Sequence, residues 1–418
     1  MSTSIILARI DTMKINFVYS LVANVYSALC KFLILLTIIR LGTPIEVGRY
    51  NYALVLSAPV FLLASLKIRS IIVTNDEYKV NHFFNAIILI NTFFFTVFIC
   101  IVSLLSNANE TIIILVVSLI KFLDNIKEVS YGVYQKDEQL KIQSVSMIMY
   151  FTLSLVSFYL SFYITSDLLI SLTLSLLSGL LTFFIFDIPV MKKKFKVFLK
   201  LTLSMSVSKK IMFLALPLSI SSAIGSLNTG LPRVFLKEFF NEYALGIFSA
   251  IAYLLVVGTL LANSLSQVFL PRLRKLFKNN KITDFVNLTK KMVLIGTAVG
   301  IFSVIASTFL GRFVLKIFFG AEYANQNEVL IILSFGLLFI LSGVFLGTSI
   351  VATGNYKVNY KISVITLLSI IIFSVSFIPV WGLIGTAYTI TCSQLVAFLS
   401  YLYFYNKEMK KWNHNTKM

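Results

Sequence analysis

Long apolar runs alternate with short polar or charged breaks along the whole chain. A helix needs about 20 apolar residues to cross roughly 30 Å of hydrocarbon, and runs of that length occur twelve times. The pattern therefore predicts an all-α polytopic membrane protein with about twelve transmembrane helices. The expected spans are 15–39, 51–70, 83–105, 111–134, 142–164, 168–190, 211–232, 245–270, 292–318, 329–352, 360–380 and 382–404.

The longest hydrophilic stretch divides these spans into two sets of six. It predicts an N-terminal six-helix bundle at 1–190, a basic cytoplasmic linker at 191–210, and a C-terminal six-helix bundle with a short basic cytoplasmic tail at 211–418. Six crossings return the chain to its starting side. The two bundles are therefore expected to be parallel repeats that face one another around a central cavity.

Composition excludes a soluble globular protein. Of the 418 residues, 58% are hydrophobic and 13% are charged, whereas soluble domains carry about 25% charged residues. The formal net charge of +19 would suggest nucleic acid as a partner in a soluble protein. Here one side of the predicted membrane holds 28 Lys and Arg, Lys127 included, and the other holds six. Because positive residues concentrate in cytoplasmic loops, this bias predicts cytoplasmic termini and argues against a nucleic-acid partner.

The sequence lacks the residue patterns of common enzyme sites. None of the 18 glycines is followed by Lys, so the chain has no P-loop for ATP. His82 and His414 lie far apart, and Cys30, Cys100 and Cys392 each lie in a separate apolar run. Clustered metal ligands are therefore not expected. These observations predict a protein that is not an enzyme and uses neither a cofactor nor a metal.

The first span carries a polar face, whose members recur every three or four residues and so share one side of a helix. An ionised side chain at the bilayer centre costs about 2.5–3.5 kcal/mol, so the cation in this face should meet water or a partner. We interpret the face as the lining of a cavity. Contact between helices is the alternative, and it explains Ser27 but not Lys31. The members are Asn16, Ser20, Asn24, Ser27 and Lys31.

The seventh span repeats this arrangement on a helix that Pro217 should kink. Its base, Arg233, and Arg40 of the first span both lie near the outer ends of their helices. Snorkelling to the interface is therefore the alternative to facing the cavity. Tyr253 belongs to a further polar, uncharged face on the eighth span. The members of the seventh face are Ser219, Ser222, Ser226, Thr229 and Arg233.

The second and fourth spans also contain charged residues. In the second span, heptad spacing predicts that Ser65 and Arg69 share a face with Asn51 and Ala58. In the fourth span, three charged residues at i, i+3 and i+7 are close enough for mutual pairing. They form either a charge-neutralised buried cluster or a site where protonation of a carboxylate couples to transport. These residues are Lys121, Asp124 and Glu128.

Six segments, in order along most of the chain, carry a resemblance to a known family. They are IIRLGTPIEVGRYNYA at 38–53, LPLSISSAIGSLNTGLPRVFL at 216–236, ALGIFSAIAYL at 244–254, VFLPRLRKLF at 268–277, LKIFFGAEYANQNEVLIIL at 315–333 and FIPVWGLIGTAYT at 377–389. The chain resembles the polysaccharide repeat-unit flippases, the O-antigen and capsule transporters. Their superfamily, the multidrug, oligosaccharidyl-lipid and polysaccharide exporters, also contains peptidoglycan lipid flippases. Relatives often have an acid just before the arginine that corresponds to Arg233, where this chain has Pro232, so proton coupling is not expected there.

The resemblance implies that an oligosaccharide on polyprenyl diphosphate crosses from the cytoplasmic to the outer face of a bacterial cytoplasmic (inner) membrane by alternating access. Further partners that it implies are membrane lipid, a polysaccharide polymerase and a chain-length regulator. The expected diphosphate partners are Lys31, Arg69 and Lys121, with Arg233 and Arg40 as further bases. The expected sugar contacts are Asn24, Ser27, Ser226 and Tyr253, and the candidates for ion coupling are Asp124 and Glu128.

Two other functions remain open at the level of the sequence. A cation-coupled multidrug exporter belongs to the same superfamily. A membrane polysaccharide polymerase belongs to a different functional class and also spans the membrane many times.

Overall fold

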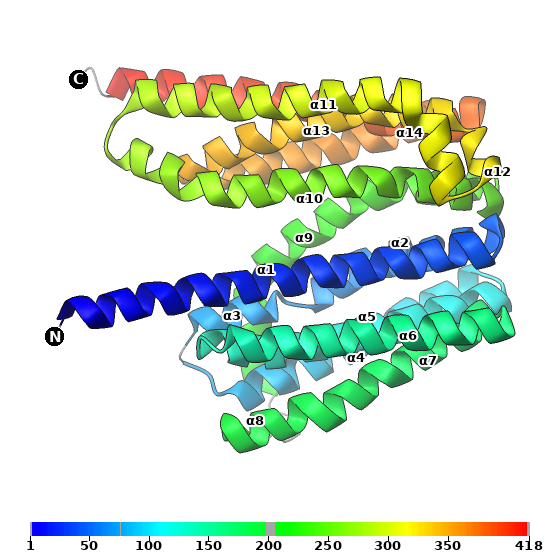
Figure 1. The fold of residues 1–418 in the computed structure, drawn as a ribbon, viewed down its shortest axis with the longest axis horizontal. Helices are drawn as coiled ribbons and strands as arrows, with labels where there is room; N and C mark the ends of the chain where they lie inside the picture. Colours follow the sequence, from blue (N-terminus) through cyan, green and yellow to red (C-terminus); the bar gives the residue numbers. More distant parts are fainter. Residues whose placement is uncertain (1, 76, 198–204, 416–418) are drawn as a thin grey trace. The chain divides into compact units, whose positions relative to one another are not determined.

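The computed structural model describes residues 2–75, 77–197 and 205–415, and the side chains of residues 2–17 are outside that description. The described backbone folds into fourteen α-helices and one π-helix, with no strand among these residues (Figure 1). The predicted all-α fold class is therefore confirmed.

The chain divides into two compact units, Met1–Ser226 and Leu227–Met418. Residues 198–204 of the predicted linker lie outside the described chain. Unit 1 contains α1 (Ser2–Leu41), α2 (Pro44–Ala64), α3 (Ile68–Thr74), α4 (Val80–Leu105), α5 (Ala108–Lys136), α6 (Leu140–Thr165), α7 (Leu168–Thr182), the π-helix η1 (Phe183–Asp187) and α8 (Ile188–Lys194). The boundary falls within α9 (Met205–Phe239), and unit 2 continues with α10 (Glu242–Lys278), α11 (Ile282–Phe318), α12 (Ala321–Ala324), α13 (Asn327–Thr353) and α14 (Tyr356–Asn415).

The helices follow the predicted spans. Nine helices in the described chain are long and apolar enough to cross a membrane, and the two arms of α9 pass the same test together. Those arms, Met205–Leu216 and Ser219–Phe239, are bent by 55°, which confirms the kink predicted at Pro217. The charged residues of α5 exclude it from this set although its 29 residues suffice for a crossing.

Helix α14 counts once in that set but contains two predicted spans. Its 60 residues include Gly382, whose φ of 52° and ψ of −120° are not helical, and such angles are accessible to glycine. The hydroxyl of Thr389 donates to the carbonyl of Phe373 at 3.1 Å. A straight helix would place these two residues about 24 Å apart, so the chain folds back on itself near Gly382, where the sequence predicts the gap between its last two spans.

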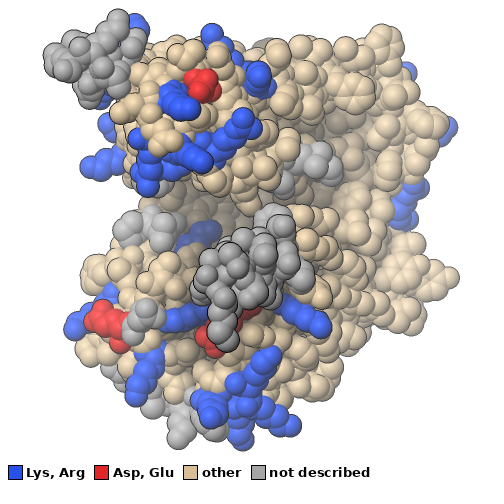
Figure 2. Space-filling model, turned by 60° about the vertical axis from the view of Figure 1, so that its left-hand side comes forward, with Lys and Arg blue, Asp and Glu red and all other residues tan. Residues whose placement is uncertain are grey.

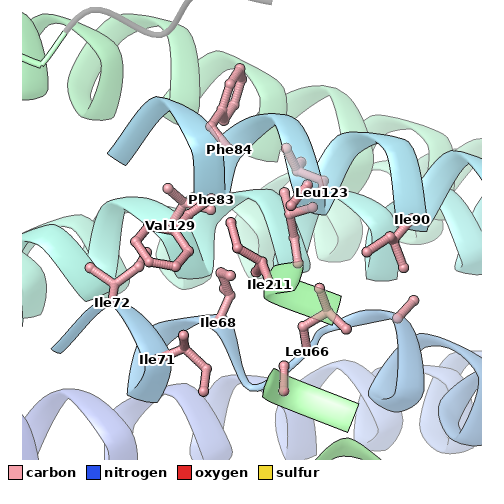
Figure 3. Close-up of a cluster of buried hydrophobic side chains, with 14 of the residues drawn as sticks. Leu66, Ile68, Ile71, Ile72, Phe83, Phe84, Ile90, Leu123, Val129 and Ile211 are labelled. Atoms are coloured by element: carbon pink, nitrogen blue, oxygen red, sulfur yellow. The ribbon is translucent and has the colours of Figure 1, made fainter. Parts of the chain in front are cut away.

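A break separates α2 from α3 inside the second predicted span. Leu66 and Lys67 both have positive φ, at 52° and 45°, a conformation that costs non-glycine residues about 1–2 kcal/mol each. Burial of Leu66 among apolar side chains of α3, α4, α5 and α9 offsets this strain (Figure 3). Ile211 reaches this cluster from the first arm of α9. The hydrophobic core of unit 1 thus includes the beginning of α9.

Basic side chains gather at one end of the helices within each unit, and Lys and Arg outnumber Asp and Glu on the face shown in Figure 2. In unit 1, hydrogen bonds join the loops at this end, from Lys136 to the carbonyl of Asn75 at 2.8 Å and from Lys194 to Gln139 at 3.0 Å. In unit 2, Trp412 donates to Asn280 at 3.3 Å. The distribution agrees with the charge asymmetry read from the sequence.

Candidate functional site

A cavity of about 460 Å³ lies within unit 1, between the α2–α3 break and α5. We call it the charged cavity because four ionisable residues predicted as site residues line it, from two separate predicted spans. Its lining consists of Arg69, Lys121, Asp124 and Glu128, with Lys67, Asn125, Ser65, Ser70, Ala58, Phe61, Leu62 and Ile68. The structure therefore brings Arg69 of the second predicted span together with the three charged candidates of the fourth.

Arg69 and Glu128 form a bidentate ion pair across α3 and α5. The guanidinium donates from Nε and Nη2 to the two carboxylate oxygens at 2.6 and 2.7 Å, and it lies over the ring of Tyr131 at 5.2 Å. Such paired hydrogen bonds fix both side chains in one geometry. Arg69 was predicted to share a continuous helix with Ser65, and this was wrong because the break at Leu66 intervenes. Both residues nevertheless line the charged cavity.

Of the predicted mutual pairing within α5, the interaction of Lys121 with Asp124 is present, but Glu128 pairs outside the helix. Glu128 pairs with Arg69 on α3, and Asp124 accepts a hydrogen bond from the hydroxyl of Tyr150 on α6 at 2.7 Å. Lys121 interacts electrostatically with Asp124 and also with Lys31 of α1. Glu128 and Asp124 thus bond to neighbouring helices, whereas Lys121 keeps its favourable electrostatic interaction with Asp124 within α5.

Lys31 lies near the middle of the apolar stretch Val18–Leu41. Its side chain is exposed, and its ammonium lies 5.0 Å from the ring centre of Phe151 on α6. Tyr26 and Thr152 share a hydrogen bond at 2.8 Å between the same two helices. No ion pair within 4.0 Å joins Lys31 or Lys121 to an acid among the described side chains. These two neighbouring cations therefore differ from Arg69, whose charge is matched by Glu128.

The rest of the polar face on α1 is mixed. Asn24 is exposed and donates to the carbonyl of Ser20 at 2.8 Å, whereas Ser27 is buried and donates to the carbonyl of Asn24 at 2.8 Å. Asn16 lies outside the described side chains. Arg40 is exposed in the last turn of α1.

A second charged group in unit 1 was missed by sequence reasoning. Lys127 and Asp187 are both fully buried, and their ammonium and carboxylate groups lie 2.7 Å apart. The sequence placed Lys127 among the topology-determining residues at the membrane edge, and this was wrong because the side chain points into the helix bundle. We call Lys127, Asp187 and their hydrogen-bonding partners the Lys127 network. Its other members are Ser146 and Tyr134, which donate to Asp187, and Thr182, which accepts from Lys127.

The π-helix η1 ends at Asp187 and interrupts the α7–α8 segment. A π-turn shifts the register of the side chains that follow it and commonly occurs at functional sites. The ammonium of Lys127 also lies 4.7 Å from the ring centre of Tyr150, whose hydroxyl binds Asp124. Tyr150 thus connects the Lys127 network with the charged cavity. The acid at 187, inside the predicted span 168–190, was the signal in the sequence for a buried basic partner.

Two buried asparagines satisfy backbone groups at the end of α2. The amide of Asn125 donates to the carbonyl of Phe61 at 2.9 Å and to Asn91 at 2.7 Å. Asn91 in turn donates to the carbonyl of Ala64 at 3.2 Å. The carbonyl of Phe61 also accepts from the backbone N–H of Ser65 at 2.8 Å. Ala64 lies in the last turn of α2, where carbonyls generally lack intrahelical partners and need side-chain donors in an apolar environment. Phe61 and Asn125 both line the charged cavity, so these contacts fix part of its wall.

In unit 2, the predicted base Arg233 interacts electrostatically with Tyr253 of α10. Its Nε is buried without a hydrogen-bonding partner among the described atoms. Ser226 is partly buried on α9, at the boundary between the units. The two bases that lie near helix ends thus differ, because Arg40 is exposed whereas the Nε atom of Arg233 is enclosed.

Relatives of the chain share a role in polysaccharide synthesis. A match to the family described as polysaccharide biosynthesis protein covers residues 13–277. The capsular polysaccharide biosynthesis protein CapF of Staphylococcus aureus is 54% identical over 392 residues, which are 94% of this chain and 99% of CapF. The chain belongs to the polysaccharide biosynthesis protein family. Residues 13–277 include every residue that lines the charged cavity or belongs to the Lys127 network, so both lie in the matched part.

Solved structures show that this polysaccharide biosynthesis protein has a transporter fold. The lipid II flippase MurJ in an inward closed conformation has a TM-score of 0.75 at 16% identity, over 95% of this chain and 90% of MurJ. An inward-facing multidrug resistance MATE transporter of the MOP superfamily has a TM-score of 0.74 at 13% identity, over 93% of this chain and 96% of the transporter. With its many apolar helices and its family, the chain is a multi-pass membrane protein.

Proposed function

We propose that the protein is a flippase that moves oligosaccharide repeat units linked to polyprenyl diphosphate from the cytoplasmic to the outer face of a bacterial cytoplasmic membrane. The observation that carries this proposal is the near full-length identity of 54% with a capsular polysaccharide biosynthesis protein. The fold supports it, because one of the proteins that share it is named as a flippase of lipid II. Alternating access around a central cavity between two six-helix bundles is part of the proposal, and so is the absence of a catalytic activity.

Lys31 and Lys121, neither of which has a salt-bridge partner among the described side chains, are the proposed contacts of the diphosphate. Lys31 and Lys121 are close enough to interact electrostatically, and a diphosphate carries enough negative charge to bind both ammonium groups. Arg69 is a weaker candidate than the sequence suggests, because Glu128 already accepts two of its donors. We retain Arg40 and Arg233 as further bases, and Asn24, Ser27, Ser226 and Tyr253 as sugar contacts.

Asp124 is the proposed site of ion coupling, in preference to Glu128. Asp124 lines the charged cavity and accepts from the neutral hydroxyl of Tyr150, whereas Glu128 is held by a guanidinium. We expect Asp124→Asn to lower transport and to remove its dependence on an imposed proton gradient. Glu128→Gln should instead destabilise the fold by about 1–2 kcal/mol, since this half-exposed pair loses one charged partner.

These two variants are compared in vesicles by following outward movement of the lipid-linked oligosaccharide with and without a proton gradient, and by thermal unfolding. A gradient-dependent Asp124→Asn variant would contradict the coupling role of Asp124. Equal loss of stability in both variants would show that Asp124 acts as a structural residue.

The membrane orientation is proposed from the charge asymmetry. Removing the buried Lys127 from the cytoplasmic-side count still leaves a large excess of Lys and Arg on that side. The positive-inside rule then places both termini in the cytoplasm. A reporter fused after Lys194 should therefore give a cytoplasmic signal, whereas an extracytoplasmic signal would reverse the orientation.

Deletion of the gene and complementation with the wild-type protein test the function itself. A flippase predicts loss of surface polysaccharide and accumulation of single lipid-linked repeat units on the cytoplasmic side. Display of a single repeat unit on the surface would instead indicate a polysaccharide polymerase. Normal surface polysaccharide with increased drug sensitivity would indicate a multidrug exporter. The polymerase and a chain-length regulator of the same pathway are the proposed protein partners.

A further inference from the structure

Unit 1 contains a second cavity, of about 700 Å³, separate from the charged cavity. It lies where α4 begins and α5 ends, beside the segment that follows α8. We call it the basic pocket, because three of its lining residues are lysines and one is an acid. The lining consists of Tyr78, Lys79, Val80, Asn81, Val133, Lys136, Asp137, Phe195, Lys196 and Val197.

Packing and hydrogen bonds fix the wall of the basic pocket after α8. The ring of Phe195 lies 5.2 Å from that of Tyr134, between ring centres. The backbone N–H of Val197 donates to the carbonyl of Met191 at 3.0 Å. Phe195 and Val197, together with Val80 of α4, pack against a buried cluster that contains Tyr134 and Met191. The pocket therefore has an apolar floor that belongs to the core of unit 1.

The charged groups of the basic pocket favour an anion. Lys79, Lys136 and Lys196 are exposed around the apolar floor, with Asp137 as the only acid among the lining residues that the structure describes. The ammonium of Lys136 is positioned by donation to the carbonyl of Asn75 at 2.8 Å. No side chain caps the N-terminus of α4 at Lys79, and the backbone N–H groups at a helix N-terminus add positive potential.

The phenol of Tyr78, which also lines the basic pocket, is neutral. Its hydrogen bond with Glu77 is the main reason why the pKa of the phenol lies above its usual value, and desolvation adds to the shift. The phenol therefore keeps its proton at physiological pH and adds no negative charge to the basic pocket.

We propose that the basic pocket binds the phosphate of an anionic lipid. Its position at the ends of two membrane-spanning helices places the lysines at the height of lipid headgroups, and basic pockets between transmembrane helices are suited to such headgroups. The apolar floor of Val80, Val133 and Val197 provides contact for the adjoining glycerol or acyl atoms. The bound phosphate belongs either to a membrane phospholipid or to a polyprenyl-linked lipid. None of these residues belongs to the charged cavity, so this proposal does not depend on the proposed function.

Native mass spectrometry of the full-length protein in detergent tests the proposal. The protein is titrated with phosphatidylglycerol or with polyprenyl diphosphate, and phosphatidylcholine is the neutral reference. We expect the triple variant Lys79→Gln, Lys136→Gln and Lys196→Gln to bind one anionic lipid at least about tenfold more weakly than wild type. The matched control replaces Lys192, Lys193 and Lys194 with Gln, which removes the same charge from the same end of unit 1 but not from the pocket lining. It should stay within about twofold of wild type.

Equal weakening by the two triple variants would overturn the proposal, because surface charge alone would then explain lipid binding. If the lining variant does not fold, Lys196→Gln alone and displacement of phosphatidylglycerol from wild type by inorganic diphosphate replace it. Failure of both to reduce lipid binding would also overturn the proposal. Similar affinities for the two lipids identify membrane phospholipid as the ligand, and a preference for polyprenyl diphosphate identifies the polyprenyl-linked lipid.

Discussion

Replacement of Lys127 with Met is expected to destabilise the folded protein by about 3–5 kcal/mol. The substitution leaves the carboxylate of Asp187 fully buried without a cation, since its other donors are the neutral hydroxyls of Ser146 and Tyr134. Uncompensated burial of an ionised group is among the largest single-residue costs in a protein. The change is measured by thermal unfolding of the purified protein and by the fraction that elutes as a single folded species.

A second substitution at Asp187 separates the charge from the packing. Lys127→Met combined with Asp187→Asn removes both charges but keeps an oxygen that accepts from Ser146 and Tyr134. This double variant should recover most of the lost stability, because removing both members of a buried pair is far less costly than removing one. Lys141→Met, at an exposed position on α6, is the control for a change from Lys to Met. Wild-type stability of the single variant would show that the Lys127 network is not required for folding.

The helices could be predicted from the sequence because the length of an apolar run is a local property. The limits of α13 and the division of α14 near Gly382 follow from such runs, and the bend of α9 follows from Pro217. Each of these features depends on residues that are adjacent in the chain. Apolar runs of this length form helices because the bilayer offers no other hydrogen-bonding partners, so every backbone group in a span is satisfied within the helix.

Pairing between distant residues could not be predicted in the same way. Lys127 and Asp187 are 60 residues apart, and the charge count places Lys127 with the cytoplasmic-side residues although the predicted span 111–134 contains it. No glycine or proline next to Leu66 indicates the break in the sequence. Buried contacts of Leu66 stabilise the left-handed backbone there, and these contacts include residues from distant parts of the chain. Arg69 therefore lines the charged cavity from α3, after the break, and not from a continuous helix with the predicted heptad spacing.

Lys31→Ala is expected to abolish surface polysaccharide while the protein still inserts and folds. The side chain is exposed, and its cation–π contact with Phe151 contributes only about 0.5–1 kcal/mol at such a site, so the fold should tolerate the change. The proposed contact with diphosphate is larger, because a hydrogen bond to a charged group is worth about 1.5–3 kcal/mol. Surface polysaccharide is measured on intact cells and membrane insertion by immunoblotting. Lys141→Ala is the control, and Lys31→Arg should retain part of the activity.

Variants of Lys121 test whether Lys31 and Lys121 bind the same diphosphate. Lys31 and Lys121 interact electrostatically, and residues that share a ligand have non-additive effects. We therefore expect affinity for polyprenyl diphosphate to fall by about tenfold to a hundredfold in Lys31→Ala and in Lys121→Ala, and the double variant to lose less than the product of the two effects. Multiplicative losses would show two independent sites. Normal polysaccharide display by Lys31→Ala would contradict the assignment, because a cation in the middle of a membrane span would then have no role in transport.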